Sequence, residues 1–397
     1  MRISPSVFRF VEAIQMKILH VVPFFSPSFG GSVTIPYHLT HWLAKRGHEI
    51  TVITTDYKYD PGYAQSLENV EVIPFRQVAH LGLFLYSPGM RGWLKTNISK
   101  YDVVHLHNFR SYQNNIACKY AKEFNVPYIA QPHGSLPRIV EKKGLKQLYD
   151  VVWGNDILEH ASKIVAVSGN EVEQFRQAGI PDEKITVIPN GVNYVSPASL
   201  PPAGQFREQY GIHEKHIILY VGRIHKIKGI DFLIRAFNSF IQTWTGDDVT
   251  LVIIGPDGGY RSVLEGLVEQ LGLSDKVRFI GFMSPLAAAY QDADVLVYPS
   301  TYEIFGLVPF EALLCGTPVI VTDGCGCGEL VKEAECGYLV HYGDVTGLSE
   351  LLRSALEHPD VNRGMVEAGR RYVEEHLAWE SVVKRVEEVY EESINCT

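Results

Sequence analysis

Short apolar segments alternate with longer amphipathic stretches along most of the chain. In the first half, segments typical of buried β-strands lie near residues 17–22, 49–54, 70–74, 102–106, 127–130, 163–167 and 185–188. In the second half they lie near residues 216–222, 249–254, 276–280, 294–298, 318–321 and 337–340. Because helix-length stretches separate them, the pattern predicts an α/β fold of parallel sheets with helical crossovers. From residue 344 onwards the pattern is helical to the end.

A break in this alternation divides the chain into two parts. The turn at Asn190–Gly191 and the proline-rich stretch at 197–202 predict an interdomain boundary, with one domain over 16–195 and another over 196–378. Two doubly wound domains facing each other across a cleft, at the carboxyl ends of both sheets, fit this layout. Residues 1–15 precede the first strand and are too short and wrongly flanked for a signal peptide. We expect a loose tail, or a start codon called too early.

Composition limits the class of protein. Of 397 residues, 46% are hydrophobic and 20% are charged, as in soluble globular proteins. No apolar run approaches the roughly 18 residues that span a bilayer. The six cysteines form no CxxC pair, so we expect reduced thiols and a cytoplasmic protein.

Charge is unevenly distributed. Residues 1–195 carry a net charge of +4 and residues 196–397 a net charge of −13, with +7 over 81–146 alone. The aromatic and basic stretch 81–95, with Lys142, Lys143 and Lys146, predicts a face for a polyprenyl-phosphate-linked glycan at an anionic membrane. The alternative is a domain flap with solvated lysines.

The stretch 299–320 carries the most informative pair of residues. Gly306 and Pro309 place a helix start between them, where free N–H groups and the helix dipole favour an anion. Glu303 lies just before this start and can accept hydrogen bonds from hydroxyl groups. Glu311 is expected about two turns into the helix and near the same face, so the two carboxylates suit the vicinal diols of a sugar. Two solvated glutamates on an ordinary strand-turn-helix are the alternative.

A second charged pair follows the first strand of the second half. Gly222 ends that strand, and Arg223 and Lys228 lie in the turn before a helix that begins near residue 229. Arginine offers a fixed fork of donors and lysine a mobile point charge, which together suit a diphosphate. The alternative is a solvated basic loop.

These two segments resemble the signature of retaining nucleotide-sugar glycosyltransferases of the GT-B fold, family 4 (glycosyl transferases group 1). The resemblance covers nearly all of 16–395. It implies two Rossmann-like domains and a C-terminal helix, within 379–397, that crosses back to the N-terminal domain. Arg223, Lys228 and the N–H groups of Phe305, Gly306, Leu307 and Val308 would stabilise the departing diphosphate. Glu311 would hold the ribose diol, and Glu303 the hydroxyl groups of the transferred sugar.

Further donor-site residues follow from the same resemblance. His133 comes straight after the strand 127–130 and would lie near the donor sugar, with a structural histidine as the alternative. Gly30 and Gly31 would close over the donor phosphates, with a plain turn as the alternative. Backbone around Phe282 and Met283 would contact the base.

Other motifs predict structural roles. His105 and His107 are expected to point to opposite faces of a strand, so that one metal ion cannot easily bind both. Ser168 and Glu171 have the spacing of a capping box. Cys325 and Cys327 are expected in a flexible glycine-rich loop.

Together these features predict a retaining hexosyltransferase that takes its sugar from GDP-mannose or a UDP-hexose. The predicted partner is a glycan acceptor, lipid-linked and used in cell-surface polysaccharide or glycolipid assembly on the inner face of the membrane. No cofactor, metal or nucleic acid is expected. Two alternatives stay open: a sugar-nucleotide 2-epimerase of the same fold, and an idle scaffold that binds a partner glycosyltransferase.

Overall fold

The computed structural model describes residues 15–82, 84–137 and 143–396, except for the side chains of residues 143, 145, 146 and 197. The chain folds into two compact units. The first unit comprises the chain up to Ile164 and the residues from Glu387 onwards, and the second unit comprises Val165–Val386. The predicted N-terminal tail lies outside the described residues up to residue 14, as does Lys142.

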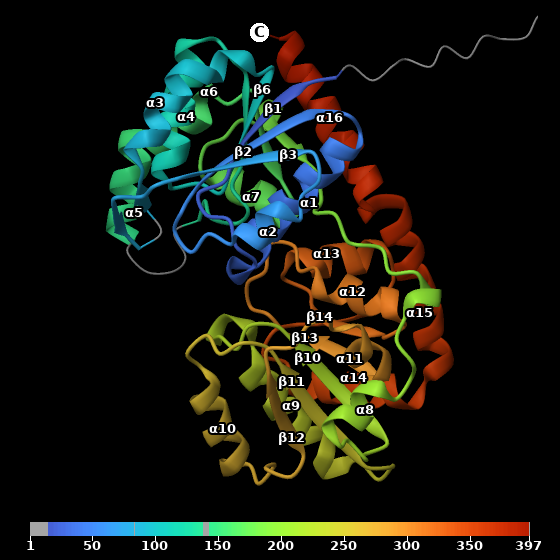
Figure 1. Ribbon diagram of the computed structural model, residues 1–397. Coiled ribbons are helices and arrows are strands. Elements are labelled where there is room, and N and C mark those ends of the chain that lie inside the picture. Colours follow the sequence, from blue (N-terminus) through green and yellow to red (C-terminus); the bar gives the residue numbers. More distant parts are fainter. Residues whose placement is uncertain (1–14, 83, 138–142, 397) are drawn as a thin grey trace, which may run out of the picture. The chain divides into compact units, whose positions relative to one another are not determined.

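The first unit is built on a parallel sheet (Figure 1). The last strands of this sheet come from the part of the chain that is assigned to the second unit. Its strands are β1 (Lys17–Val21), β2 (Glu49–Thr55), β3 (Val70–Phe75), β6 (Val103–His107), β7 (Tyr128–Gln131), β8 (Lys163–Ala166) and β9 (Ile185–Val187). They are arranged in the order β3-β2-β1-β6-β7-β8-β9. The division between the units falls inside β8.

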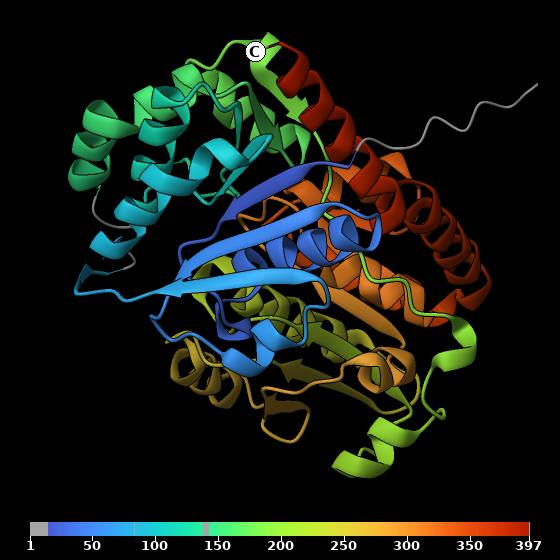
Figure 2. The same cartoon turned by 45° about the horizontal axis from the view of Figure 1, so that its top comes forward.

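Helices cover both faces of this sheet (Figure 2). They are α1 (Gly31–Lys45), α2 (Pro61–Gln65), α3 (Pro88–Asn97), α4 (Tyr112–Glu123), α5 (Lys143–Tyr149) and α6 (Asn155–His160), with a π-helical turn η3 (Asp150–Gly154) between the last two. A small antiparallel hairpin of β4 (Ala79–Leu81) and β5 (Phe84–Tyr86) was not predicted. Strands of three residues are too short to show a period along the sequence.

The second unit repeats the same architecture. Its sheet contains β10 (His216–Val221), β11 (Val249–Ile254), β12 (Val277–Gly281), β13 (Val295–Tyr298), β14 (Val319–Thr322) and β15 (Tyr338–Val340), in the order β12-β11-β10-β13-β14-β15. Its helices are α7 (Gly169–Gln177), α8 (Gln205–Tyr210), α9 (Ile230–Thr243), α10 (Arg261–Gln270), α11 (Ala287–Asp292), α12 (Val308–Cys315), α13 (Gly326–Glu333), α14 (Val345–Glu357) and α15 (Pro359–Tyr372). The last helix, α16 (Trp379–Asn395), begins in this unit and ends in the first.

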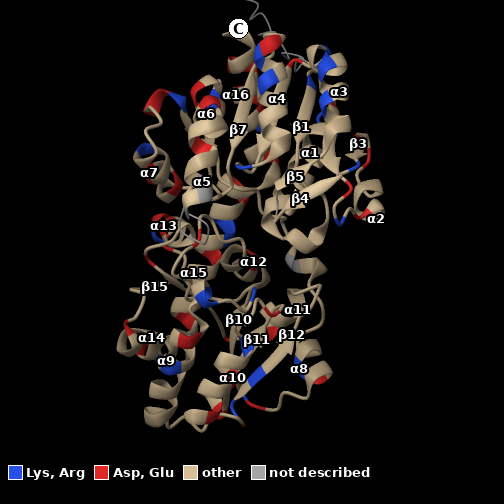
Figure 3. Ribbon diagram, turned by 90° about the vertical axis from the view of Figure 1, so that its left-hand side faces the viewer, with Lys and Arg blue, Asp and Glu red and all other residues tan. Residues whose placement is uncertain are grey.

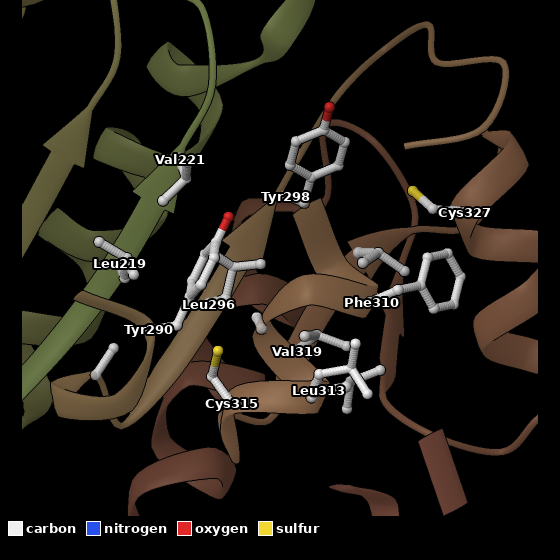
Figure 4. Packing of buried hydrophobic residues seen from close by; sticks show 14 of the residues in the cluster. Leu219, Val221, Tyr290, Leu296, Tyr298, Phe310, Leu313, Cys315, Val319 and Cys327 are labelled. Atoms are coloured by element: carbon white, nitrogen blue, oxygen red, sulfur yellow. The ribbon is translucent and has the colours of Figure 1, made fainter. Parts of the chain in front are cut away.

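Apolar side chains fill both faces of the second sheet. Leu219 and Val221 of β10 point into one cluster with Leu296 and Phe310 (Figure 4). Ile218, from the alternate positions of β10, joins the cluster on the other face. Because helices cover both faces, the strands are continuously apolar, as expected for a parallel sheet.

In both sheets the strand order reverses at one place. In the first sheet this switch point lies between β1 and β6, and in the second between β10 and β13. In open α/β sheets, ligands bind outside the carboxyl ends of the strands at this point. The predicted fold class of two Rossmann-like α/β units is therefore confirmed, as are the predicted strands of both sheets and the helical pattern after residue 344. In the described part of the chain, none of the helices is both long enough and apolar enough to cross a lipid bilayer.

Candidate active site

The loops after β10 and β11 approach each other so closely that only glycine fits. Gly255 has φ +152°, and a Cβ atom there would lie 1.9 Å from the carbonyl oxygen of Gly222. Gly222 itself has φ +150°. This contact fixes the path of the chain into Arg223, whose side chain is exposed. Arg223 forms no ion pair with any residue that the structure describes, so its guanidinium is available to an anion.

A short 3-10 turn, η6 (Lys226–Lys228), carries the second predicted cation. The turn ends at Gly229, where φ is +66° and a Cβ atom would lie 2.0 Å from the carbonyl oxygen of Pro299. The backbone N–H and the hydroxyl of Thr301 both donate to the carbonyl oxygen of Ile227, each over 2.9 Å. These contacts hold the loop after β10 against the loop after β13.

Lys228, Glu303 and Tyr298 form a hydrogen-bonded cluster at the switch point of the second unit. The ammonium of Lys228 pairs with Oε2 of Glu303, and the two side chains are 12% and 21% exposed. The hydroxyl of Tyr298, at the end of β13, donates to the same oxygen over 2.7 Å. Burial and the charge of Glu303 raise the pKa of Tyr298 well above its ordinary value, so this phenol stays a donor. Figure 4 shows Tyr298 at the edge of the apolar core.

Glu311 lies in a different position from the predicted one. Helix α12 begins at Val308, as the glycine and proline predicted, but Glu311 is then in its first turn and not two turns in. Glu303 lies outside the helix, so the argument that helical periodicity places both carboxylates on one face was wrong. Glu311 is partly buried, and Tyr290 donates to its Oε2 over 2.9 Å. Burial raises the pKa of Glu311, against the opposing effect of the Tyr290 hydrogen bond.

The backbone that leads into α12 is tightly packed. Phe305 is buried, and Gly306 has φ +80° with its missing Cβ position 3.1 Å from Cβ and Sγ of Cys327. Leu307 is the N-cap of the helix and Val308 its first residue. The expectation of a flexible loop at Cys325 and Cys327 was wrong, because Cys325 is the N-cap of α13 and both thiols are buried.

Two predicted base-contacting residues follow β12. Phe282 is 76% exposed, while Met283 is partly buried and packs against the apolar cluster. An exposed phenylalanine at the carboxyl end of a strand offers an aromatic face to a planar ring.

The predicted glycines of the first unit are less constrained. Gly30 is the N-cap of α1, with φ +64°, and Gly31 is the first residue of that helix rather than part of a loop. No atom lies within 4 Å of a Cβ built on either glycine. Packing therefore does not require glycine here, although the backbone conformation of Gly30 favours it.

Histidines occupy the switch point of the first unit. His105 and His107 of β6 stack on each other with ring centroids 4.1 Å apart. The prediction that they point to opposite faces was wrong, because residues two apart in a strand share a face. His133 has φ +50°, and its Nε2 lies 3.0 Å from Nδ1 of His107. His20 of β1 lies beside them, with Nδ1 2.9 Å from Nε2 of His107.

The structure brings only some of the predicted residues together. Lys228 and Glu303 are in contact, Glu311 is held by α11 through Tyr290, and His133 belongs to the first unit. Sequence reasoning missed Tyr298, Tyr290 and His20. Tyr298 could have been found as the last polar group of the strand before Glu303, whereas the other two come from elements distant in sequence from the residues they contact.

Comparisons with known protein families match both halves of the chain. Residues 203–372 match the model described as glycosyl transferases group 1, and residues 29–195 match the model of glycosyltransferase family 4. An uncharacterised glycosyltransferase of Methanocaldococcus jannaschii is 29% identical over 94% of this chain and 98% of its own length. The N-acetyl-alpha-D-glucosaminyl L-malate synthase of Bacillus anthracis is 26% identical over 92% of this chain and 94% of its own.

Solved structures show the same fold. The Anabaena protein HepE, in complex with UDP, superposes with a TM-score of 0.78 at 22% identity, over 95% of this chain and all of its own. A glycosyltransferase from Rickettsia africae superposes with a TM-score of 0.79 at 22% identity, over 96% of this chain and all of its own.

Proposed function

We propose that this chain, which belongs to the glycosyl transferases of group 1 and has the GT-B fold, transfers a hexose with retention to a glycan acceptor. The family membership itself means that the sugar comes from a nucleotide sugar. The observation that carries the proposal is the cluster of Lys228, Glu303 and Tyr298 at the switch point of the second sheet, together with the exposed Arg223 in the loop after β10. This arrangement would offer cations to a diphosphate and a carboxylate to the hydroxyl groups of a sugar.

The charges of these residues suggest different roles for Arg223 and Lys228. Glu303 neutralises Lys228 through their ion pair, whereas Arg223 is exposed and has no such partner among the described residues. Arg223 therefore supplies the uncompensated charge that attracts the diphosphate. As the sugar–phosphate bond breaks, negative charge grows on the leaving oxygen, and Lys228 turns from Glu303 towards it.

The configuration at the anomeric carbon is retained because the acceptor attacks the same face of the sugar that the diphosphate leaves. The acceptor hydroxyl attacks the anomeric carbon there, and a phosphate oxygen of the leaving diphosphate takes its proton. Glu303, relieved of part of its pairing with Lys228, holds a hydroxyl of the transferred sugar while Tyr298 keeps the carboxylate in place. No residue of this chain has to form a covalent bond with the sugar.

The nucleotide is proposed to bind beside Glu311 and Phe282. Glu311 is held by Tyr290 at the first turn of α12 and would accept hydrogen bonds from the ribose diol. Phe282 is exposed where the base would lie. HepE shares only its fold with this chain, and its structures are in complex with UDP and with UDP-glucose. This likeness supports a uridine nucleotide over a guanosine nucleotide.

Calorimetric titration with UDP and with GDP tests the donor site. We expect binding of one nucleotide, weakened at least tenfold in Arg223→Gln and left unchanged in Lys226→Gln, a matched lysine-loop control. Equal weakening in both variants would mean that the loop acts only through its overall charge. Binding of neither nucleotide would contradict the assignment of the donor site.

A lipid-linked acceptor is proposed from an exposed apolar surface of the first unit. Leu148, Val151, Val152 and Trp153, on α5 and η3, are between 46% and 68% exposed. Basic residues lie on α4, which Tyr149 of α5 contacts, and on α3 of the same unit (Figure 3). Exposed apolar side chains with basic neighbours are typical of surfaces that bind anionic membranes, which suits a peripheral protein of the cytoplasmic face.

Vesicle sedimentation tests this surface. The wild-type protein should sediment with vesicles that contain anionic phospholipid, and Val151→Ser/Trp153→Ser should not. Val263→Ser, at another exposed valine (53%) in the second unit, is the control. Equal sedimentation of all three proteins would contradict the proposal.

A further inference from the structure

A row of three histidines leads from the buried interior of the first unit to His133. Nδ1 of His20 lies 2.9 Å from Nε2 of His107, and Nδ1 of His107 lies 3.0 Å from Nε2 of His133. The rings of adjacent members are nearly parallel, with interplanar angles of 13° and 11°. Both ring nitrogens of His107 are therefore engaged. His20 and His107 are fully buried, and His133 is partly exposed.

Burial keeps these rings neutral. It lowers the pKa values of His20 and His133 to about 3 and that of His107 well below its ordinary value. A neutral imidazole has one N–H and one bare nitrogen, so each ring donates on one side and accepts on the other. The tautomers of the three rings are consequently linked. Either every N–H points towards His133, or every N–H points towards His20.

The buried end of the row distinguishes the two arrangements. Nε2 of His20 is buried and has no hydrogen-bond partner among the described residues. If the N–H groups pointed inwards, His20 would bury an unpaired donor there, whereas the outward arrangement leaves only a bare acceptor. Unpaired buried N–H groups are rarer in proteins than undersatisfied acceptors. The outward arrangement also puts the last N–H on the partly exposed ring, where a ligand or water can accept it.

We propose that His107, oriented by His20, is a positioning residue that holds His133 in the tautomer with the proton on Nδ1. His133 then faces its ligand as a hydrogen-bond donor, and its Nε2 is reserved for His107. This inference rests on the proposed function in one respect, the identity of the ligand. That ligand is the donor sugar, and its hydroxyl or ring oxygen accepts the hydrogen bond. The nitrogen that carries the proton in a histidine is set by the partner of the other nitrogen.

Variants of His107 offer a graded test. His107→Asp places an acceptor-only oxygen near the position of Nδ1 and should turn His133 to the Nε2–H tautomer. His107→Asn keeps an amide N–H at that position and should preserve the Nδ1–H tautomer. His107→Leu removes both options and should leave His133 as a mixture of tautomers.

Nitrogen-15 spectroscopy of histidine-labelled protein, without nucleotide, reads these tautomers directly. The signals of His133 are assigned by their loss in His133→Gln. We expect a protonated Nδ1 and a bare Nε2 in the wild type and in His107→Asn, and the reverse in His107→Asp. A protonated Nε2 in the wild type would overturn the proposal, as would identical His133 signals in His107→Asn and His107→Leu. The Asn and Leu pair keeps the test valid if a buried aspartate prevents folding.

A metal ion is the competing use of this cluster. Ring nitrogens of His20, His105 and His107 lie within 4.8 Å of one another, but an ion bound by all three would need a nitrogen of His107, and hydrogen bonds already engage both of its nitrogens. A shift of these three sets of signals on addition of one equivalent of Zn²⁺ would therefore overturn the hydrogen-bonded row.

The consequence for turnover is measured separately. In His107→Asp, kcat should fall about tenfold or more while nucleotide affinity stays within about twofold, because the ring remains in place with its proton on the wrong nitrogen. If the nucleotide does not bind even to the wild type, the proposed function fails. The tautomer of His133 would still be decided by the spectra.

Discussion

The two units share one topology but place opposite chemistry at its switch point. In the first unit, the adjoining strands β1 and β6 carry His20, His105 and His107, which burial keeps uncharged. In the second unit, the loops after β10 and β13 carry Arg223, Lys228 and Glu303, of which the last two form an ion pair. Backbone topology alone therefore does not decide which side chains a switch point carries.

Under the proposed function, this difference would suit each unit to a different task. Charged groups beside open loops suit the diphosphate, whose charge changes during the reaction. Neutral rings fixed by hydrogen bonds suit the sugar, whose hydroxyl groups are recognised by direction more than by charge. Predictions that separate charge from geometry therefore test this comparison best.

The largest effect is expected at Lys228. Lys228→Gln should lower kcat/KM about a hundred- to a thousandfold, or roughly 3–4 kcal/mol, which is typical for removing one group that stabilises charge in the transition state. Steady-state kinetics with saturating acceptor measure it. Lys226→Gln, in the same turn, should stay close to the wild type. Similar losses in both variants would show that the ion pair with Glu303 has no special role.

Glycine substitutions should separate the two units by stability. Gly255→Ala should lower the free energy of unfolding by about 2–4 kcal/mol, because its Cβ atom would meet a backbone carbonyl at 1.9 Å. Gly30→Ala has open space around it and only the strain of its positive φ, so about 1 kcal/mol is expected. Denaturant unfolding measures both. An equal cost would mean that the loops after β10 and β11 can move apart.

Glu311 tests the nucleotide side of the second unit. Glu311→Ala should weaken nucleotide binding by about 1–3 kcal/mol, the range for losing hydrogen bonds to a charged group. Tyr290→Phe keeps the carboxylate but removes its hydrogen bond, so a smaller loss is expected. Calorimetry measures both, and unchanged affinity in Glu311→Ala would rule out a ribose contact.

The smallest effect is a pH dependence of the first unit. Burial raises the pKa of Glu387, but hydrogen bonds from His48 and Arg46 outweigh it, so the pKa lies below its ordinary value of 4.5. A carboxylate with a depressed pKa stabilises the fold above its unfolded pKa, and this contribution is lost as the pH falls through the lower folded value. Stability should therefore decline below about pH 4.5, by roughly 1 kcal/mol for this group. In Glu387→Gln this part of the decline should be absent, and an unchanged pH profile would contradict the assignment.

Much of the fold was predictable because its strands are continuous apolar segments separated by helix-length stretches. The β4–β5 hairpin was not predictable, since its strands are too short to show a period. The residue roles in the candidate site remain predictions. The sequence indicated where Lys228 and Glu303 lie, as both follow strands that meet at the switch point.

The hydrogen-bond partners of the site residues were harder to predict than the positions of those residues in the fold. Tyr298 and Tyr290 are aromatic residues within apolar segments, and only the folded chain shows that their hydroxyls donate to Glu303 and Glu311. The start of α12 was predicted correctly, yet Glu311 was placed one turn too far along, because the helix does not extend back to Glu303. The histidine row needed the parallel pairing of β1 with β6, which joins residues more than eighty positions apart.

Helix α16 ends in the first unit, and this affects when the folding of that unit can be completed. Glu387 hydrogen-bonds to His48, and the hydroxyl of Tyr390 lies 2.7 Å from Nδ1 of the buried His105. A ribosome makes these two residues 339 and 285 positions after their partners. Until they emerge, His48 and His105 lack these partners, so the unit that is synthesised first cannot be the first to be finished.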